Sequence, residues 1–272
     1  PSQIFVKVIN SIIKKNFFML KDKILNREAG ILLYGMTPPK ENTDIAKVID
    51  IASKHINRIK SLDIDGVVLY DIQDESARNE DARPFPFLPT FEPQKYSGDF
   101  LGGLDLPKVL FQVVGKHDEA SLRTWMNNNV NNGDLAVFIG NSSSAQATDI
   151  TMNKAFSLRS EYADSMLIGG VAIPERHYAK KDEHLRISSK IDSGVSFFTT
   201  QAVYNVEASK NMLSEYYYHS KKNNLPLVPI MMTFSPCGST KTMDFMKWLG
   251  IHFPKWLKND LTNSQDILGA SI

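Results

Sequence analysis

The sequence predicts an α/β fold built on a parallel sheet, and two observations support this. Apolar runs of strand length alternate along the chain with longer segments of helical periodicity, which is typical of repeated strand–helix units. The number of these runs favours a TIM (β/α)8 barrel, in which the carboxyl ends of the strands carry the chemistry. Strands are expected at residues 31–36, 67–70, 109–114, 135–139, 166–173, 195–200 and 227–233.

Helices are expected between these strands, and residues 1–272 are expected to form a single barrel domain with a helical extension at 1–29. The extension contains an amphipathic pattern at 3–15. The other helices are expected at 44–59, 118–129, 151–163, 179–190, 206–223 and 240–249. No run with strand character follows residue 249, so the eighth strand is missing and we expect the chain to be incomplete at its C-terminus.

Composition narrows the class of protein. The chain has 272 residues, 42% of them hydrophobic, and its 31 basic and 30 acidic side chains leave a net charge of +1. This balance gives no electrostatic reason to expect a nucleic-acid or membrane partner. The single cysteine, Cys237, is typical of a reducing compartment, and no apolar run reaches the roughly 18 residues of a membrane span. We therefore expect a cytoplasmic protein, and the sequence leaves a homo-oligomer open.

The stretch from 166 to 205 carries the strongest functional signal. An apolar run ends at Pro174, which cannot donate to a sheet, and the charged residues Glu175, Arg176 and His177 follow at once. A second apolar run at 195–200 is followed directly by Gln201. Polar side chains just past the carboxyl ends of parallel strands are where α/β folds bind their ligands.

This ordered set resembles the methylenetetrahydrofolate reductase family, which are flavin-dependent barrels. The matching residues are Pro174, Glu175, His177, Lys190, Thr200, Gln201 and Tyr204. The resemblance implies that FAD lies across the strand ends. It also implies hydride transfer from NAD(P)H through the flavin, which reduces 5,10-methylenetetrahydrofolate to 5-methyltetrahydrofolate.

The resemblance also implies roles for individual residues. Asn141, His177, Glu183 and Lys190 would lie near the flavin, with Glu183 holding ribityl hydroxyls and Lys190 neutralising a phosphate. Gln201 and Tyr204 would face the folate, because a carboxamide can both donate to and accept from a pterin edge. No His-Glu-x-x-His pattern is present, so no metal site is expected.

Two positions depart from the family pattern. The family's first strand carries the glutamate that acts as general acid, and Gly35 stands at that position here. A reductase would need a replacement acid. Glu75 is the first candidate and Asp74 the second, with Asp71 and Glu41 as further candidates. The alternative interpretation is that Asp71, Asp74 and Glu75 are solvated loop charges. At the fourth strand, Asn141 replaces an aspartate that lies close to the flavin in the family.

Two functions therefore remain open from the sequence. The first is a methylenetetrahydrofolate reductase-like oxidoreductase that uses NAD(P)H and FAD to make 5-methyltetrahydrofolate for methionine biosynthesis. The second is a non-reductive folate- or pterin-binding protein or a methyltransferase-associated subunit. Gly35 favours the second, and Gln201 and Lys190 are compatible with both.

Overall fold

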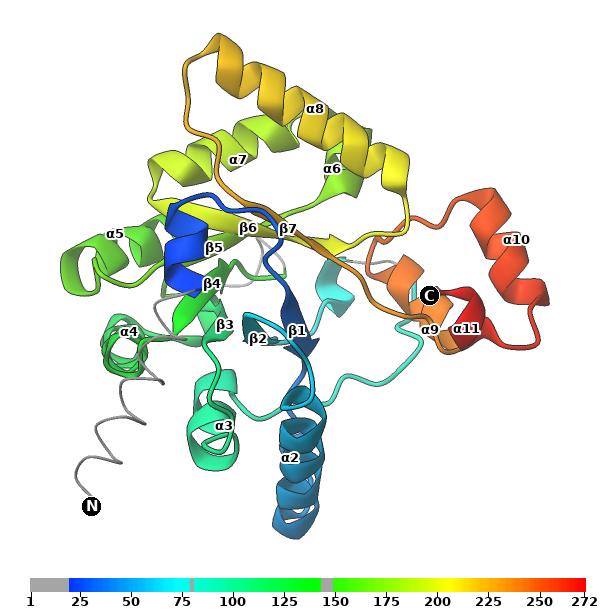
Figure 1. Cartoon of the computed structure of the whole chain (residues 1–272), viewed down its shortest axis with the longest axis horizontal. Helices are drawn as coiled ribbons and strands as arrows, with labels where there is room; N and C mark the ends of the chain where they lie inside the picture. Colours follow the sequence, from blue (N-terminus) through cyan, green and yellow to red (C-terminus); the bar gives the residue numbers. More distant parts are fainter. Residues whose placement is uncertain (1–19, 79–80, 143–148) are drawn as a thin grey trace. The chain divides into compact units, whose positions relative to one another are not determined.

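The computed structural model describes residues 20–78, 81–142 and 149–272, and the helix predicted at 3–15 lies outside these ranges. The described chain is an α/β fold, in which seven strands form one sheet in the order β1-β2-β3-β4-β5-β6-β7 (Figure 1). The pairs β1–β2, β2–β3, β3–β4, β4–β5 and β6–β7 are all parallel. Parallel neighbours in chain order are what the predicted strand–helix alternation requires.

The strands are short and mostly apolar on both faces, as expected of a parallel sheet covered by helices. In β3 and β4, for example, nearly every residue is buried. The bounds are β1 Leu33–Met36, β2 Gly66–Leu69, β3 Lys108–Val113, β4 Leu135–Ile139, β5 Ile168–Ala172, β6 Val195–Ala202 and β7 Ile230–Thr233. Seven of the seven strands predicted from the sequence are therefore present, and the described residues contain no eighth.

The chain divides into two compact units. The first runs to Gln73 and resumes over Leu88–Gly169, and the second comprises Asp74–Phe87 and Gly170–Ile272. The border at 169/170 falls inside β5, so both units use this strand. The segment Asp74–Phe87 belongs to the second unit although β2 before it and α3 after it belong to the first.

In the first unit the helices begin at side chains that accept backbone N–H groups. Asp44 caps α2, Glu92 caps α3, and Asp118 forms a capping box with Ser121 at the start of α4. Gly133 ends α4 in the left-handed region, with φ of 72°. The bounds are α2 Ile45–Ile59, α3 Pro93–Phe100, α4 Glu119–Asn132 and α5 Met152–Tyr162, with a short 3-10 turn η2 at Val114–Lys116.

The second unit carries the remaining helices. Their bounds are α6 Pro174–Lys180, α7 Glu183–Asp192, α8 Val206–Lys222, α9 Thr240–Trp248, α10 Lys255–Asn263 and α11 Ile267–Ala270, with the 3-10 turn η1 at Ser76–Arg78. One of its hydrophobic clusters joins the end of β6 to the C-terminal helices. That cluster contains Tyr204, Cys237, Met243, Met246, Ile251, Phe253 and Leu261.

Three sequence predictions need correction. The single helix expected at 179–190 is two helices, because Pro174 already starts α6 and Lys181, with φ of 58°, ends it in the left-handed region. The long connection between the strands predicted at 67–70 and 109–114, to which no helix was assigned from the sequence, contains η1 and α3. After residue 249, where the family pattern implies one long helix, the chain forms two short helices, α10 and α11.

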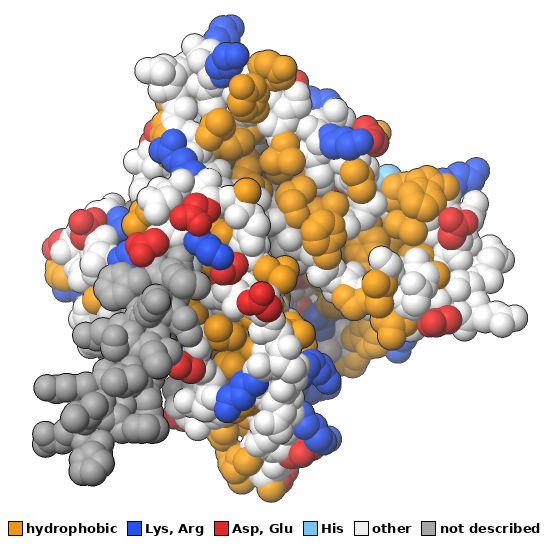
Figure 2. Space-filling view, viewed as in Figure 1, with side chains coloured by type: hydrophobic (Ala, Val, Ile, Leu, Met, Phe, Trp, Pro, Cys, Tyr) orange, Lys and Arg blue, Asp and Glu red, His pale blue; other side chains and the backbone are white. Residues whose placement is uncertain are grey.

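Helix α8 has an apolar surface as well as a buried face. Tyr216 is buried, whereas Val206, Tyr217 and Tyr218 are exposed. In Figure 2, hydrophobic side chains gather beside this helix, along β7 and the segment that precedes it. A single aromatic run therefore supplies both core and surface residues, as helical periodicity requires. None of the helices in the described ranges is both long enough and apolar enough to cross a bilayer.

Candidate functional site

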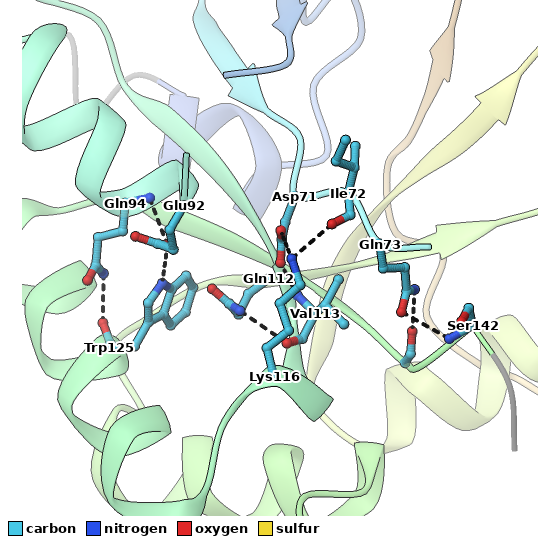
Figure 3. Close-up of polar contacts among 11 residues, drawn as sticks. Asp71, Ile72, Gln73, Glu92, Gln94, Gln112, Val113, Lys116, Trp125 and Ser142 are labelled. Atoms are coloured by element: carbon cyan, nitrogen blue, oxygen red, sulfur yellow. Dashed lines mark hydrogen bonds and ion pairs between the residues drawn. The ribbon is translucent and has the colours of Figure 1, made fainter. Parts of the chain in front are cut away.

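Asp71 organises the strand ends in the first unit (Figure 3). Its side chain is 3% exposed, and one carboxylate oxygen accepts the backbone N–H of Val113 at 2.9 Å. The other oxygen accepts from Lys116 Nζ at 2.5 Å, and the same ammonium group donates to the Ile72 carbonyl at 2.9 Å. Because both oxygens are occupied, Asp71 holds the end of β2 against the end of β3 and is poorly placed to donate a proton to a ligand.

The loops after β2 and β4 are joined by one side chain. Gln73 donates from Nε2 to the Gly140 carbonyl at 3.0 Å and accepts the Ser142 N–H on Oε1 at 3.0 Å, as Figure 3 shows. Asn141 lies between these two anchor points and packs on Gly115, where an ideal Cβ would be only 1.7 Å from Asn141 Oδ1. Glycine is required at 115 for this approach. The backbone around Asn141 is thus fixed from both sides.

Tyr70 fills the space beside Gly35. An ideal Cβ on Gly35 would be 2.8 Å from Tyr70 Cε2 and 2.9 Å from its hydroxyl oxygen. The Tyr70 ring also meets the edge of Phe111 at a centroid distance of 4.8 Å. Gly35 is exposed and Tyr70 is half-buried, so solvent reaches this corner. Any side chain at position 35, a glutamate included, would require Tyr70 to move.

In the second unit, Gln201 and Tyr204 lie at and just after the end of β6 and meet the segment that follows α9. Gln201 Nε2 donates to the Leu249 carbonyl at 2.9 Å. Tyr204 packs on Phe253 with ring centroids 4.1 Å apart, and its hydroxyl donates to the Ser235 carbonyl. Burial raises the pKa of Tyr204 to about 12. Tyr204 is therefore neutral and supplies an aromatic surface, and Gln201 supplies a polar group from the same strand end.

Glu175 lies at the start of α6, next to the end of β5. It interacts with His252, which belongs to the segment that follows α9. Its Oε2 atom is buried without a hydrogen-bond partner among the described residues. Burial raises the pKa of the carboxyl group, while backbone N–H groups and His252 oppose this rise. His252 also contacts the Asn205 side chain at 3.0 Å and stacks with Tyr178. Buried polar atoms without partners mark places where a ligand can supply the missing hydrogen bond.

Glu183 and Lys190 have interior partners. The Glu183 side chain is fully buried and accepts from the Ile173 N–H at 3.0 Å and from Arg176 at 2.9 Å. Lys190 donates to the Val171 carbonyl at 2.7 Å, and burial lowers its pKa to about 8. Both side chains tie helices α6 and α7 to the end of β5. Their predicted contacts with a flavin stay predictions, and those contacts would compete with these bonds.

His177 packs within a row of histidines. Its ring lies 5.5 Å from that of His184, which lies 5.2 Å from that of His219. His177 is 1% exposed, and burial, followed by the charge of His184, lowers its pKa. Within the described ranges, no group of three or more His, Cys, Asp or Glu side chains is arranged to hold a metal ion.

The predicted acids Asp74 and Glu75 belong to the segment Asp74–Phe87 of the second unit. Asp74 accepts from the Ser76 hydroxyl and N–H, and these bonds lower its pKa. Glu75 is half-buried. Asp74 is therefore ionised near neutral pH and is a weak candidate for a proton donor, which leaves Glu75 as the better of the two.

This segment is fastened to α9 by Arg83. The guanidinium carbon lies 5.3 Å from the Phe87 ring centroid, 5.0 Å from that of Phe245 and 5.6 Å from that of Trp248. Arg83 also donates to the Phe85 carbonyl at 2.9 Å, and Trp248 Nε1 donates to the Asp81 carbonyl at 2.9 Å. Cation–π contacts with three rings make this a well-defined attachment.

The structure therefore brings Glu175, Gln201 and Tyr204 to one segment of the second unit, residues 249–253. Asn141 belongs to the first unit. Sequence reasoning missed Tyr70, because a tyrosine after an apolar run is also typical of a core residue. It also missed His252, which follows α9 in a stretch with no motif of its own.

The chain is similar both to a protein family and to a solved structure. A model of the methylenetetrahydrofolate reductase family matches residues 140–267. A solved structure from Clostridium thermocellum, an uncharacterized protein that binds two copies of 5-methyl-5,6,7,8-tetrahydrofolic acid, is 48% identical with a TM-score of 0.80. That alignment covers 93% of this chain and 82% of the other.

More distant structures also match. The crystal structure of 2,3-dimethylmalate lyase, from the PEP mutase/isocitrate lyase superfamily, is 9% identical with a TM-score of 0.48. It covers 88% of this chain and 79% of its own, and at this distance it supports no argument about fold or function. A comparison with curated proteins finds no match.

Proposed function

Since the chain belongs to the methylenetetrahydrofolate reductase family, we propose that it binds reduced folate of the 5-methyltetrahydrofolate type, with the pterin held by Glu175 and Gln201. The Clostridium protein, 48% identical over nearly the whole chain, binds two copies of this folate, and we propose that this chain also takes two. This similarity is the observation that carries the proposal.

The chemistry of the two side chains suits a pterin. The amino group and ring N–H of a pterin are adjacent donors, and a carboxylate accepts both. Glu175 offers a buried oxygen that lacks a partner among the described residues. Gln201 already donates to Leu249, and its remaining amide hydrogen and its oxygen can serve a neighbouring ring edge. Tyr204 and Phe253 supply aromatic surface beside them.

Reduction of 5,10-methylenetetrahydrofolate with NAD(P)H and FAD is the second candidate, and the motif from Pro174 to Gln201 favours it. The interior contacts of Glu183 and Lys190 count against a flavin at these residues. Glu183 has no exposed surface, and Lys190 already donates to the Val171 carbonyl in the interior. As these two side chains stand, they do not fit a flavin.

Calorimetric titration of the purified protein with 5-methyltetrahydrofolate tests the first candidate. Glu175→Gln keeps the shape but removes the charge, and we expect binding roughly tenfold or more weaker, the scale of a lost hydrogen bond to a charged group. Glu207→Gln, which alters an exposed ion pair with Lys210, is the matched control. Unchanged affinity in Glu175→Gln, or no binding by the unmutated protein, would contradict the proposal.

The same sample separates the two candidates. A reductase would oxidise NAD(P)H only when 5,10-methylenetetrahydrofolate is present, with or without added FAD. A binding protein would leave NAD(P)H unchanged while still binding 5-methyltetrahydrofolate. A flavin absorption band in the purified protein would also support the reductase function.

A further inference from the structure

An exposed histidine lies beside the Glu175 carboxylate. His252 is exposed, whereas Ile251 and Phe253 on either side of it are buried. Its ring stacks with that of Tyr178, with centroids 6.4 Å apart and an angle of 18° between the planes. Tyr178 and Glu175 are three residues apart on α6, so they share a face of this helix. Burial raises the pKa of Glu175, and the backbone N–H and ring of His252 oppose this rise, as groups next to the carboxylate do.

The hydrogen bond with Asn205 determines which ring nitrogen of His252 carries the proton. Asn205 is buried at the start of α8, and its Oδ1 atom accepts the Ala208 N–H at 3.1 Å as the helix cap. This bond orients the amide, so the atom that lies 3.0 Å from His252 Nδ1 is the donor Nδ2. In the neutral ring Nδ1 must therefore accept, and the proton lies on Nε2. His252 thus keeps a free choice of acceptor for its Nε2–H group.

We propose that His252 determines specificity for the 4-oxo group of the pterin: its Nε2–H donates to O4 while Glu175 accepts the neighbouring N3–H and amino group. This inference rests on the proposed function, because it adds a residue to the same pterin site. A carboxylate that accepts two donors has no contact with the group at C4. A donor beside it favours 4-oxo pterins, such as folates, over 4-amino pterins, in which two donors would face each other.

Two ligands that differ only at C4 test this inference. At pH 8, where the pteridine ring is uncharged, we expect 5-methyltetrahydrofolate to bind roughly tenfold or more tightly than its 4-amino counterpart, the scale of one polar group left unpaired. His252→Ala should abolish this preference. His252→Gln places an amide N–H near the position of Nε2 and should restore it, whereas the shorter amide of His252→Asn should not. Lys258→Ala, which alters an exposed residue of α10, is the control.

The position of the proton can be measured without a ligand. The ¹⁵N chemical shifts of the His252 ring should show a proton on Nε2 and an unprotonated Nδ1 at pH 8. The spectrum of His252→Gln identifies this ring among the six histidines of the chain. Asn205→Asp keeps an acceptor for the Ala208 N–H but turns an oxygen toward Nδ1, so the proton should move to Nδ1. We expect this variant to lose the preference for the 4-oxo ligand by roughly tenfold or more.

Three results would overturn this inference while the proposed function stands. The first is equal binding of the 4-oxo and 4-amino ligands by the unmutated protein. The second is an unchanged preference in His252→Ala. The third is a proton on Nδ1 of His252 in the unmutated protein. If the unmutated protein binds no 5-methyltetrahydrofolate at all, the proposed function itself is wrong, and the role of His252 is wrong with it.

Discussion

At the scale of single residues, the hydrogen-bond partners of a buried carboxylate distinguish a structural role from a ligand-binding role. Glu183 has both oxygens engaged by Ile173 and Arg176, whereas Glu175 has a buried oxygen, Oε2, that has no hydrogen-bond partner among the described residues. The two residues lie eight positions apart in one stretch of the sequence, and the sequence alone does not distinguish their roles. Their partners do, because a carboxylate with satisfied oxygens gains nothing from a ligand.

Removing the Glu183 carboxylate should therefore destabilise the fold. Glu183→Ala leaves Arg176 and the Ile173 N–H without their partner, and we expect a loss of about 3–5 kcal/mol in the free energy of unfolding. Urea denaturation measures this, with Glu207→Ala as a surface control that should change stability by about 0.5 kcal/mol or less. Full stability combined with lost ligand binding would instead make Glu183 a ligand-binding residue.

Asp134 should give the protein a pH-dependent stability. Burial raises its pKa to about 7, against about 3.9 in an unfolded chain. Between these values the folded state holds a proton that the unfolded state has released, so stability falls as the pH rises. Asp134→Asn should remove this loss in the free energy of unfolding, which is at most about 4 kcal/mol at pH 8.

Urea denaturation at pH 4.5 and at pH 8 tests this expectation. Asp134→Asn should exceed the unmutated protein in stability at the higher pH and differ little at the lower. Asp50→Asn, which alters an exposed carboxylate of α2, is the control. An Asp134→Asn variant that is equally stabilised at both pH values would show that the carboxyl group does not titrate with folding.

At the scale of elements, the segment Asp74–Phe87 depends on contacts with α9. Arg83 lies against Phe245 and Trp248, and the Trp248 indole holds the Asp81 carbonyl. Lys241 adds a second cation over the Phe85 ring at 4.6 Å. Because a loop of this length has little secondary structure of its own, these side chains decide how well it is ordered.

Arg83→Ala should loosen this segment selectively. We expect faster amide hydrogen exchange over residues 74–87, by roughly tenfold or more, because a partly desolvated cation–π contact contributes about 1–2 kcal/mol. Lys241→Ala should have a smaller effect, and Lys47→Ala on α2 should have none. Unchanged exchange in Arg83→Ala would mean that the aromatic contacts of Phe85 with Phe245 are sufficient.

Sequence reasoning succeeded where a local pattern decides the structure. The strands at 109–114 and 135–139 are apolar runs between polar turns, and β3 and β4 lie there. It failed at α6 and α7, because Lys181 adopts the left-handed conformation, which is uncommon for a residue other than glycine and has no sequence signal here. At the candidate site it proposed Glu175 and Gln201 from a motif, and their contact with a ligand stays a prediction. It could not find Tyr70, whose position depends on the absent side chain of Gly35.

At the scale of the whole molecule, β5 links the two units. Ile168 and Gly169 belong to the first unit, and Gly170 to Ala172 belong to the second. A strand loses its hydrogen-bond partners when the neighbouring strand becomes disordered. Disorder in the half of β5 that belongs to one unit therefore removes support from the half that belongs to the other unit. The units are therefore expected to unfold together.

Tryptophan fluorescence can test this, because the chain has three tryptophans. Trp125 belongs to the first unit, and Trp248 and Trp256 belong to the second. Trp125→Phe leaves reporters of the second unit only, and the double variant Trp248→Phe, Trp256→Phe leaves a reporter of the first. The two should give the same denaturation midpoint, and separate midpoints would show independent unfolding.

The path of the segment Asp74–Phe87 has a practical consequence for anyone who divides the gene. The chain passes between the units at 73/74, at 87/88 and again at 169/170. No single cut can yield either unit intact. A fragment that starts at residue 170 would leave Phe245 and Trp248 without Arg83, with apolar rings turned to water and prone to aggregate. Joining residues 74–87 to this fragment through a linker would restore the contacts of Phe245 and Trp248 with Arg83.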